Sequence, residues 1–349
     1  MSWLAGDETM IRRQSLYFVA PGVAEIREED LSLPGEGEAR VQTLVSAISS
    51  GTEMLIYRGQ APTGMAVDET IAALGGAFRF PIKFGYAAVG RVIAVGPDVS
   101  ATWMGRTVFA FNPHESHFVA PVAALHCVPE GIEPEDAVFL PNMETAVSFI
   151  MDGSPVIGER VAVIGQGVVG LLTTALLSGW PLGGLLAVDP LRRRQEWALR
   201  LGATAVAPPG AAPDALAALP GEGPSAGVDL CFELSGNPRA LDLAIALTGQ
   251  YGRIVIGSWY GNKPVEVDLG GRFHRAHMRL IGSQVSALAP QWLGRWTKER
   301  RLDVAWRMIG HHGPRRLITH RLPIGGAPEG YRLLDDDPAE VVQIVFTYP

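Results

Sequence analysis

The stretch Arg160-Val-Ala-Val-Ile-Gly165-Gln-Gly-Val-Val-Gly170 decides how the rest of the chain is organised. The continuous apolar run from Val161 to Ile164 is typical of a central parallel strand that is buried on both faces. From Val168 onward the apolar residues recur with a helical period instead. A second apolar run, Leu185–Val188, ends on Asp189. Strand, spaced glycines, helix, strand and acidic residue in this order are the fingerprint of a dinucleotide site.

Each part of the fingerprint has a physical task. Gly165 permits the tight turn, Gly167 lets the backbone approach a pyrophosphate, and Gly170 allows the helix to pack closely on the strand. The N–H groups at the start of the helix then face the phosphates. Asp189 is expected to accept hydrogen bonds from the adenosine ribose. The residues predicted to bind the phosphates are Gly165, Gln166, Gly167, Val168, Val169 and Gly170.

Two other interpretations of this stretch were weighed. Three spaced glycines are weak evidence by themselves in a chain with 41 glycines, but the flanking strand, helix and Asp189 argue against chance. The low charge from Val161 to Val188 would also suit a transmembrane helix. The glycines, Pro181 and the change from a strand-like to a helical pattern argue against a membrane span.

Composition sets further bounds. A length of 349 residues favours two domains, and 47% hydrophobic with 19% charged residues is ordinary for a soluble globular protein. The net charge of −7 argues against nucleic acid as the main partner. Cys127 and Cys231 lie far apart in apolar surroundings, which fits a reducing compartment. The first residues lack the apolar core of a secretory signal, so we expect a cytoplasmic protein that does not bind membranes.

The remainder of the chain divides into two kinds of pattern. Short strands broken by Gly and Pro turns fill residues 15–50 and 85–121, which favours a small, curved β-barrel. Residues 60–79 interrupt this pattern and are expected to form a surface excursion that helps to shape a binding site. From Gly131 to residue 283, helices and strands alternate, which predicts a parallel, doubly wound sheet. Two helices at 290–299 and 302–311 and a final strand–helix–strand group close the chain.

In this order the chain resembles the medium-chain dehydrogenase/reductase superfamily, the alcohol dehydrogenase-like enzymes. The resemblance rests on Ser50–Glu53, Pro81–Val92, the fingerprint, Glu233–Gly236 and Leu317–Pro323. It implies an α/β protein with a GroES-like β-barrel catalytic domain, residues 1–147 and 286–349, around a Rossmann domain, residues 148–285. It also implies a substrate cleft at the junction of these domains. Ser235, Gly257 and Ser258 are then expected to contact the cofactor.

The chain departs from the zinc-containing members of this family. Those members have a Cys where this chain has Ser50, and His-Glu where it has Tyr86-Ala87. Hydroxyl and methyl groups cannot replace thiolate and imidazole as zinc ligands at neutral pH. The structural zinc requires four Cys, whereas the chain has two, and the His of the family's proton relay falls at Leu55. We therefore expect neither a catalytic nor a structural zinc ion. Among relatives that lack zinc, the segments Ser46–Glu53 and Tyr57–Gly59 are similar to bacteriochlorophyllide-type dehydrogenases.

Without zinc, hydroxyl, ammonium or imidazole groups must stabilise an alkoxide-like oxygen and move a proton. Thr52 matches the family position whose hydroxyl touches the substrate oxygen, and Tyr86 replaces a zinc-ligating His. Glu53 is expected to orient Tyr86, and Lys83 to lower its pKa if the two side chains meet. Each of these residues also has an ordinary structural interpretation.

Two further residues are candidates for the site. His114 follows a loop that borders the cleft in the family, and Glu144 lies on a helix that passes beside the nicotinamide there. The pairs His114/His117 and His274/His277 have metal-compatible spacing, but no neighbouring ligand completes either set.

Asp189 also bears on the choice of cofactor. A 2′-phosphate at about 4 Å from its carboxylate would be disfavoured by about 4 kcal/mol at an effective dielectric near 20. Arg192, Arg193 and Arg194 offset part of this penalty, and Arg194 matches a family position near the ribose. NAD is therefore favoured over NADP.

Together these features predict a zinc-independent oxidoreductase, a homodimer, that transfers a hydride between NAD(H) and an organic alcohol/carbonyl substrate. One alternative is an NADPH-dependent quinone or enone reductase, which needs less stabilisation of an alkoxide. Another is a nucleotide-binding protein without turnover.

Overall fold

The computed structural model describes residues 10–62, 78–220 and 227–349. These residues divide into two compact units, which we call unit 1 and unit 2. Unit 1 contains the described residues up to Phe139 together with Ile318–Pro349, and unit 2 is Leu140–Leu317. The sequence-based boundaries assigned residues 140–147 and 286–317 to the catalytic domain, whereas in the structure they pack with unit 2.

Unit 1 is rich in strands, as the Gly/Pro-punctuated sequence predicts. A three-stranded sheet has the order β2-β1-β4, and a mixed sheet has the order β15-β16-β3-β5-β6-β8, with β7 paired to β3. Its elements are β1 (Ile11–Ala20), β2 (Val23–Leu31), β3 (Glu38–Ala47), α1 (Ser50–Tyr57), β4 (Ile82–Lys83), β5 (Ala88–Val95), β6 (Thr107–Ala110), β7 (His117–Pro121), β8 (His126–Cys127), α2 (Pro134–Ala137), β15 (Ile318–Pro323), α9 (Ala327–Asp336) and β16 (Gln343–Thr347).

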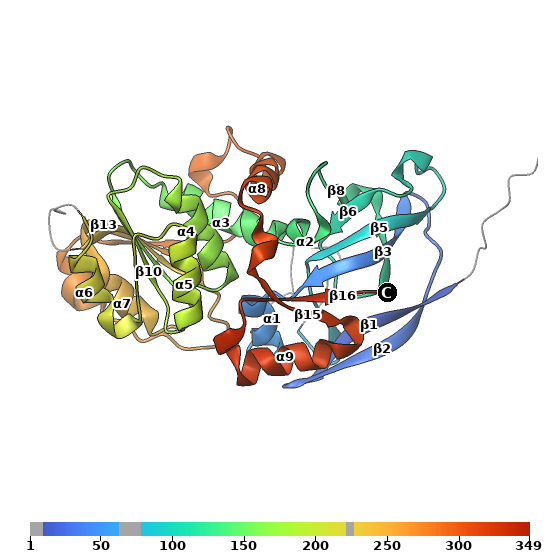
Figure 1. Ribbon diagram of the computed structural model, residues 1–349, viewed down its shortest axis with the longest axis horizontal. Helices are drawn as coiled ribbons and strands as arrows, with labels where there is room; N and C mark the ends of the chain where they lie inside the picture. The colour runs from blue at the N-terminus through green and yellow to red at the C-terminus, as the bar shows by residue number, and fades with distance from the viewer. Residues whose placement is uncertain (1–9, 63–77, 221–226) are drawn as a thin grey trace, which may run out of the picture. The chain divides into compact units, whose positions relative to one another are not determined.

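The two ends of the chain meet inside unit 1. Strand β16 pairs antiparallel with β3, with Phe346 opposite Ser46. Helix α9 packs beside α1, so that red and blue segments lie side by side in Figure 1. Strand β3 therefore pairs with β16 as well as with β5 and β7, which precede unit 2 in the chain.

Unit 2 is built on the parallel sheet that the fingerprint predicts. Its six strands have the order β11-β10-β9-β12-β13-β14, and all of its described pairings are parallel. Its elements are α3 (Leu140–Gly153), β9 (Arg160–Ile164), α4 (Val168–Ser178), β10 (Gly184–Val188), α5 (Arg192–Arg200), β11 (Ala205–Ala207), α6 (Ala212–Ala217), β12 (Val228–Glu233), α7 (Ala240–Leu247), β13 (Thr248–Ile256), β14 (Arg279–Gly282) and α8 (Lys298–His312).

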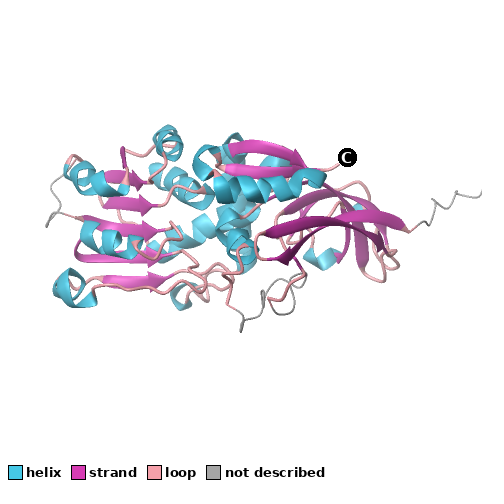
Figure 2. Cartoon of the chain, turned by 90° about the horizontal axis from the view of Figure 1, so that it is seen from below, coloured by secondary structure: helices cyan, strands magenta, loops and turns pink. Residues whose placement is uncertain are grey.

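Helices cover both faces of this sheet, as Figure 2 shows. Ala162 and Ile164 of β9 pack with residues of α6 and α7, whereas Val161 and Val163 pack with α3 and α4. These four side chains are all buried, because alternate residues of a strand point to opposite faces of the sheet and both faces are covered. The predicted doubly wound α/β sheet is confirmed.

Some element boundaries differ from the sequence-based expectation. The predicted helix at 134–153 is two helices, α2 and α3. The two helices expected at 290–299 and 302–311 are a 3-10 turn at Pro290–Trp292 followed by the single helix α8. The side chain of Thr297 caps α8 by accepting a hydrogen bond from the N–H of Arg300, which explains why the helix begins there.

The predicted excursion at 60–79 falls mainly on residues 63–77, which lie outside the described residues. No helix among residues 10–62, 78–220 and 227–349 has the length and apolarity needed to cross a membrane.

Candidate functional site

The glycine turn after β9 has the geometry that a dinucleotide needs. Gly165 has a φ of +91°, and a β-carbon there would lie 2.5 Å from Ser235 Cα. A β-carbon on Gly170 would overlap the carbonyl oxygen of Gly165, whereas a β-carbon on Gly167 would meet no atom within 4 Å. The first and third glycines are therefore required by the fold, and the second faces open space.

Helix α4 begins immediately after this turn. Gly167 is its N-cap residue and has no side chain to bond the first-turn N–H groups, so those at Val168 and Val169 can receive a phosphate oxygen. The Gln166 side chain is fully buried: its amide donates to Val163 O, and its oxygen accepts from Thr174. Gln166 therefore takes part through its backbone rather than its side chain.

Asp189, at the end of β10, is tied to the same turn. Its Oδ2 accepts the N–H of Gln166 at 2.7 Å, and its Oδ1 accepts the N–H of Leu191 at 2.9 Å. The residue is 2% exposed. Because a carboxylate oxygen has two acceptor positions, each can still accept a ribose hydroxyl.

The three arginines after Asp189 have different surroundings. The Nη1 atom of Arg194 lies 3.8 Å from Asp189 Oδ2, as expected for a residue near the adenosine ribose. Arg192 is largely exposed and pairs with Glu196 on the next turn of α5. Arg194 therefore lies close enough to neutralise part of the Asp189 charge.

A second polar group lies at the carboxyl ends of β12 and β13. The buried Glu233 accepts hydrogen bonds from the N–H and hydroxyl of Ser235 and from the hydroxyl of Tyr260. Ser258 Oγ accepts the N–H of Gly236 at 2.8 Å. Burial first, and then Glu233, raises the pKa of Tyr260. In the sequence Glu233 is recognised only as part of a family motif, and its contact with Tyr260 was not predicted.

The predicted cofactor contacts Ser235 and Ser258 are thus part of a hydrogen-bonded strand end. Gly257 has a clear packing reason, because a β-carbon there would overlap the ring of Phe149. Ligands of open parallel sheets bind outside the carboxyl ends of the strands, at the point where the strand order reverses, which here lies between β9 and β12.

Unit 1 brings three hydroxyl side chains together, which we call the hydroxyl cluster: Ser49, Thr52 and Tyr86. The Tyr86 hydroxyl donates to Ser49 Oγ and lies 3.3 Å from Thr52 Oγ1. Thr52 lies on α1, Ser49 is its N-cap residue, and Tyr86 precedes β5. Thr52 and Tyr86, which were predicted separately as catalytic residues, therefore lie next to each other. Sequence reasoning did not single out Ser49, because only the fold places it against Tyr86.

Glu53 and His114 also meet, but not as predicted. Glu53 Oε1 accepts the N–H of Ser49 at 2.7 Å, and His114 Nε2 lies 3.0 Å from Glu53 Oε2. Ser49 thus connects Glu53 with Tyr86, where we had expected Glu53 to orient Tyr86 itself. His114 is 0% exposed, so the predicted direct contact with a substrate is wrong.

Lys83 does not act on Tyr86. Its Nζ lies 2.7 Å from Glu29 Oε2 and 2.9 Å from Glu115 Oε1. Burial lowers the pKa of Lys83, but the two carboxylates outweigh burial and raise it. Two carboxylates therefore hold the ammonium group, and the predicted effect on the Tyr86 pKa is wrong.

Glu144 is likewise engaged elsewhere. It is a buried residue of α3, and its Oε1 lies 2.9 Å from Nη2 of the buried Arg301 on α8. Arg301 also donates to Ser148 and to the carbonyl of Val285. Burial raises the pKa of Glu144, and Arg301 offsets this only in part. This carboxylate holds α8 on α3, and a role as a free polar group beside a ligand is wrong.

The described residues do not fit a zinc ion. No group of three His, Cys, Asp or Glu side chains with metal-binding geometry occurs within 10–62, 78–220 and 227–349. Ser50, Tyr86 and Ala87 supply neither thiolate nor imidazole. Neither of the His pairs with metal-compatible spacing belongs to such a group.

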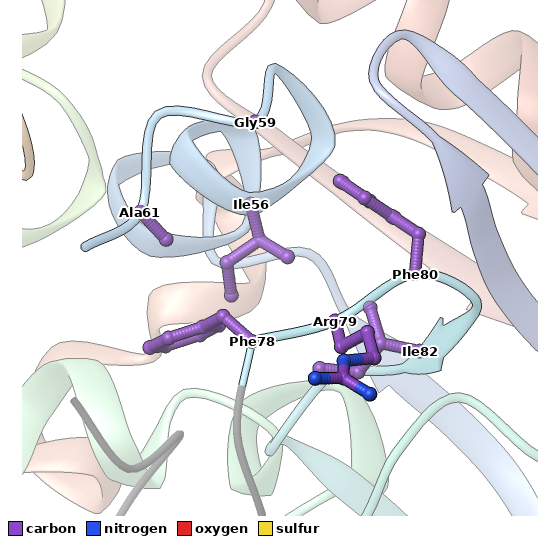
Figure 3. A pocket seen from close by; sticks show the side chains of 7 residues that line it. All are labelled: Ile56, Gly59, Ala61, Phe78, Arg79, Phe80 and Ile82. Carbon is purple, nitrogen blue, oxygen red and sulfur yellow. The ribbon is translucent and has the colours of Figure 1, made fainter. Parts of the chain in front are cut away.

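A small pocket lies next to the end of α1, as Figure 3 shows. Ile56 points toward Phe78 across it. Its walls are mainly apolar, with one guanidinium group: Ile56, Gly59, Ala61, Phe78, Arg79, Phe80 and Ile82. The pocket lies within unit 1 and contains none of the predicted catalytic residues.

Comparison with known proteins agrees with this geometry. Residues 168–311 match the model of the zinc-binding dehydrogenase family. The chain is 22% identical to D-guloside 3-dehydrogenase of Escherichia coli K12, over 96% of this chain and 100% of the relative. The fold matches 2R,3R-butanediol dehydrogenase of Bacillus subtilis with a TM-score of 0.77, at 18% identity over 96% and 99% of the two chains.

A further match is an alcohol dehydrogenase of Escherichia coli CFT073 that was solved with NADH, with a TM-score of 0.75 at 18% identity over 96% and 99% of the chains. Residues 168–311 thus match the zinc-binding dehydrogenase family, and the whole chain has the fold of alcohol dehydrogenase-like enzymes. The chain is an oxidoreductase that is similar to alcohol dehydrogenase-like enzymes.

Proposed function

We propose that this chain is a zinc-independent oxidoreductase that transfers a hydride between NAD(H) and a secondary alcohol/ketone pair. The observation that carries the proposal is the hydroxyl cluster, in which Tyr86 contacts Ser49 and Thr52. Tyr86 stands where the resemblance to the family puts a zinc-ligating His. A phenol hydroxyl in that position supplies a hydrogen-bond donor to a substrate oxygen in place of a Lewis acid.

The cofactor would be held by residues of unit 2. The first-turn N–H groups of α4 would bind the pyrophosphate, and Asp189 would bind the ribose hydroxyls. Bound nicotinamide would supply or accept the hydride. Asp189 supports NAD over NADP, because a 2′-phosphate would lie against a carboxylate that Arg194 neutralises only in part.

The hydroxyl cluster would perform the proton chemistry. In ketone reduction the substrate carbon gains a hydride, and Tyr86 donates its phenolic proton to the oxygen on which negative charge develops. Ser49 or Thr52 then returns a proton to the phenolate, and that proton comes from water. Alcohol oxidation follows the reverse order, with release of one proton.

The proposed substrate class follows from the relatives. D-guloside 3-dehydrogenase, L-threonine 3-dehydrogenase and 2R,3R-butanediol dehydrogenase are named for secondary alcohol positions. Hydroxyl side chains in the hydroxyl cluster suit a substrate that presents an alcohol oxygen. We therefore propose a small or medium-sized secondary alcohol, including sugar-derived alcohols.

The test is turnover of a panel of secondary alcohols with NAD, for the wild type, Tyr86→Phe and Thr52→Val. Both variants are expected to lower kcat roughly tenfold or more while leaving NADH affinity nearly unchanged, because general acid–base groups contribute about 10²–10⁴-fold. Tyr251→Phe, at an exposed position of unit 2, is the matched control. Full activity in both hydroxyl variants would remove them from the mechanism.

The same panel separates the alternatives. Reduction of enones or quinones with NADPH, without alcohol oxidation, would replace this function with an enone reductase. Tight NADH binding without hydride exchange on any substrate would indicate a nucleotide sensor instead.

We also propose a homodimer. The edge strand β14 of the parallel sheet supports it, because an edge strand offers unpaired backbone groups to a second copy. Light scattering of the purified protein tests this, and a monomeric mass would refute it.

A further inference from the structure

Glu53 is a buried carboxylate that joins three separate parts of unit 1. It lies on α1 and is 0% exposed. Its oxygens accept the N–H of Ser49 at 2.7 Å and the hydroxyl of Tyr331 on α9, and His114 Nε2 lies 3.0 Å from Oε2. Burial first, and then Glu53, raises the pKa of Tyr331, which therefore stays a donor. A buried carboxylate with this many partners is fixed in position.

The His114 ring is fixed as well. Its Nδ1 lies 2.7 Å from Ser46 Oγ, which in turn lies 2.7 Å from the Tyr348 hydroxyl. Phe346 packs edge-on against the His114 ring, with the two ring centroids 5.0 Å apart. On another side of the ring is Gly85, where a β-carbon would come within 2.7 Å. The ring has no room to rotate away from Glu53.

Ser49 links this buried network to the hydroxyl cluster. The backbone N–H of Ser49 is held by Glu53, and its Oγ accepts from Tyr86. The same residue is the N-cap of α1, although its own side chain makes no cap hydrogen bond. Its hydroxyl accepts from Tyr86 instead of capping the helix, while Glu53, four residues later, holds its backbone N–H.

We propose that Glu53, held by His114, is a positioning residue that keeps the Ser49 and Thr52 hydroxyls on Tyr86 during proton transfer. This inference rests on the proposed function. Loss of the Glu53 acceptor releases the first turn of α1, and with it the two hydroxyls that Tyr86 contacts. A displacement of about 1 Å of a catalytic group costs on the order of a hundredfold in rate.

Glu53→Ala and Glu53→Gln separate this role from a purely electrostatic one. Glutamine keeps an oxygen that accepts the N–H of Ser49. Its amide NH2 can donate to His114 if the ring protonates Nδ1 instead, with Ser46 and Tyr348 reversing their hydrogen bonds. It can also donate to the hydroxyl oxygen of Tyr331, which then accepts where it donated to Glu53. Geometry is then retained while the negative charge is lost.

The experiment measures kcat, KM and the pH profile of kcat for both variants with NAD and the best alcohol of the panel. Glu53→Ala is expected to lower kcat roughly ten- to hundredfold with nearly unchanged KM for NAD, and Glu53→Gln to recover most of the rate and the wild-type profile. If Glu53→Ala is not recovered folded, Glu53→Asp replaces it, since the shorter side chain cannot reach both Ser49 and His114. Wild-type kcat in the truncated variant, or equal loss in Glu53→Gln, would overturn the proposal.

A second measurement does not depend on activity. The ultraviolet absorbance of each protein is measured as a function of pH, and the absorbance of its Tyr86→Phe counterpart is subtracted. The difference isolates the titration of the Tyr86 phenol. This titration is expected to shift in Glu53→Ala and to stay unchanged in Glu53→Gln; an unchanged curve in Glu53→Ala would overturn the positioning role. If the wild type oxidises no alcohol, the proposed function fails, while the titration still decides whether Glu53 positions the hydroxyl cluster.

Discussion

The carbonyl oxygen of Gly165 occupies the space that a β-carbon on Gly170 would need. Gly167, between them, faces no atom within 4 Å of such a carbon. Two glycines of one motif are thus required for different reasons, one by the fold and one by the ligand.

Alanine substitutions separate these reasons. Gly170→Ala is expected to destabilise the protein, because backbone must move to admit the methyl group. Gly167→Ala should retain the wild-type melting temperature and raise the Kd for NADH at least about tenfold, or about 1.4 kcal/mol, because the methyl group occupies the phosphate surface. Differential scanning fluorimetry and NADH fluorescence titration measure the two effects. Unchanged NADH affinity in Gly167→Ala would contradict the assignment of the pyrophosphate to this turn.

Asp189→Ala removes the acceptor predicted for the ribose hydroxyls. We expect NADH binding to weaken by roughly 1.5–3 kcal/mol, the scale of lost hydrogen bonds to a charged group. Because Asp189 also accepts the N–H groups of Gln166 and Leu191, melting temperature must be followed in parallel. Affinity for NADPH should fall less than affinity for NADH. An unaltered Kd for NADH would remove Asp189 from the cofactor site.

Zinc content is a direct prediction. Ser50, Tyr86 and Ala87 offer no thiolate or imidazole, so purified protein is expected to contain no stoichiometric zinc and to keep its activity after dialysis against a chelator. Atomic emission of the dialysed protein measures this. One zinc per chain would overturn the mechanism proposed for Tyr86.

The ion pair between Arg301 and Glu144 is buried on both sides. Arg301→Met leaves a buried carboxylate without its partner and should cost about 3–5 kcal/mol of unfolding free energy, whereas the double variant with Glu144→Leu should cost less. The Glu144 pKa, already raised, should rise further in Arg301→Met, so protonation favours the folded state and the loss should shrink at acid pH. Urea titrations at several pH values measure this, with the exposed Arg307→Met on the same helix as control. If Arg301→Met alone were as stable as the wild type, the role of this ion pair would be refuted.

The pKa of Glu29 is shifted in the opposite direction from that of Glu144. Burial raises it, but hydrogen bonds from Lys83, Tyr17 and Ser15 outweigh burial and lower it to about 2 from 4.5. A depressed carboxyl pKa contributes stability above about pH 4.5 that is lost as pH falls toward 2. The stability difference between the wild type and Glu29→Gln should therefore shrink over that window. Glu28→Gln, next in the chain and exposed, should show little dependence on pH.

The sequence specified unit 2 well, because its signals are local. Val161–Ile164, the glycine turn and Asp189 lie within one strand–helix–strand segment, where periodicity and backbone conformation are decided by neighbouring residues. The contact between Gln166 and Asp189 follows from that segment alone. The cap at Thr297 was also a local signal, and it would have placed the start of α8 correctly.

The chemistry of unit 1 depends on contacts between distant residues. Glu53 and His114 are 61 positions apart, and Glu53 and Tyr331 are 278 apart. The residues around Lys83 in the sequence do not indicate whether its ammonium group contacts two carboxylates or a phenol. A partly buried lysine on a strand is compatible with either partner. Family position singled out Thr52 and Tyr86 separately, and the fold brings them together. It could not identify Ser49, whose role arises from how α1 begins.

The pairing of β16 with β3 has a consequence for biosynthesis. Residues 318–349 leave the ribosome after the whole of unit 2, yet they supply Tyr331 and Tyr348 to the buried network under the hydroxyl cluster. The parallel sheet of unit 2 has all of its strands before the last part of unit 1 is synthesised. A nascent chain therefore acquires the sheet of unit 2 first and completes the support of the hydroxyl cluster only when residues 318–349 follow.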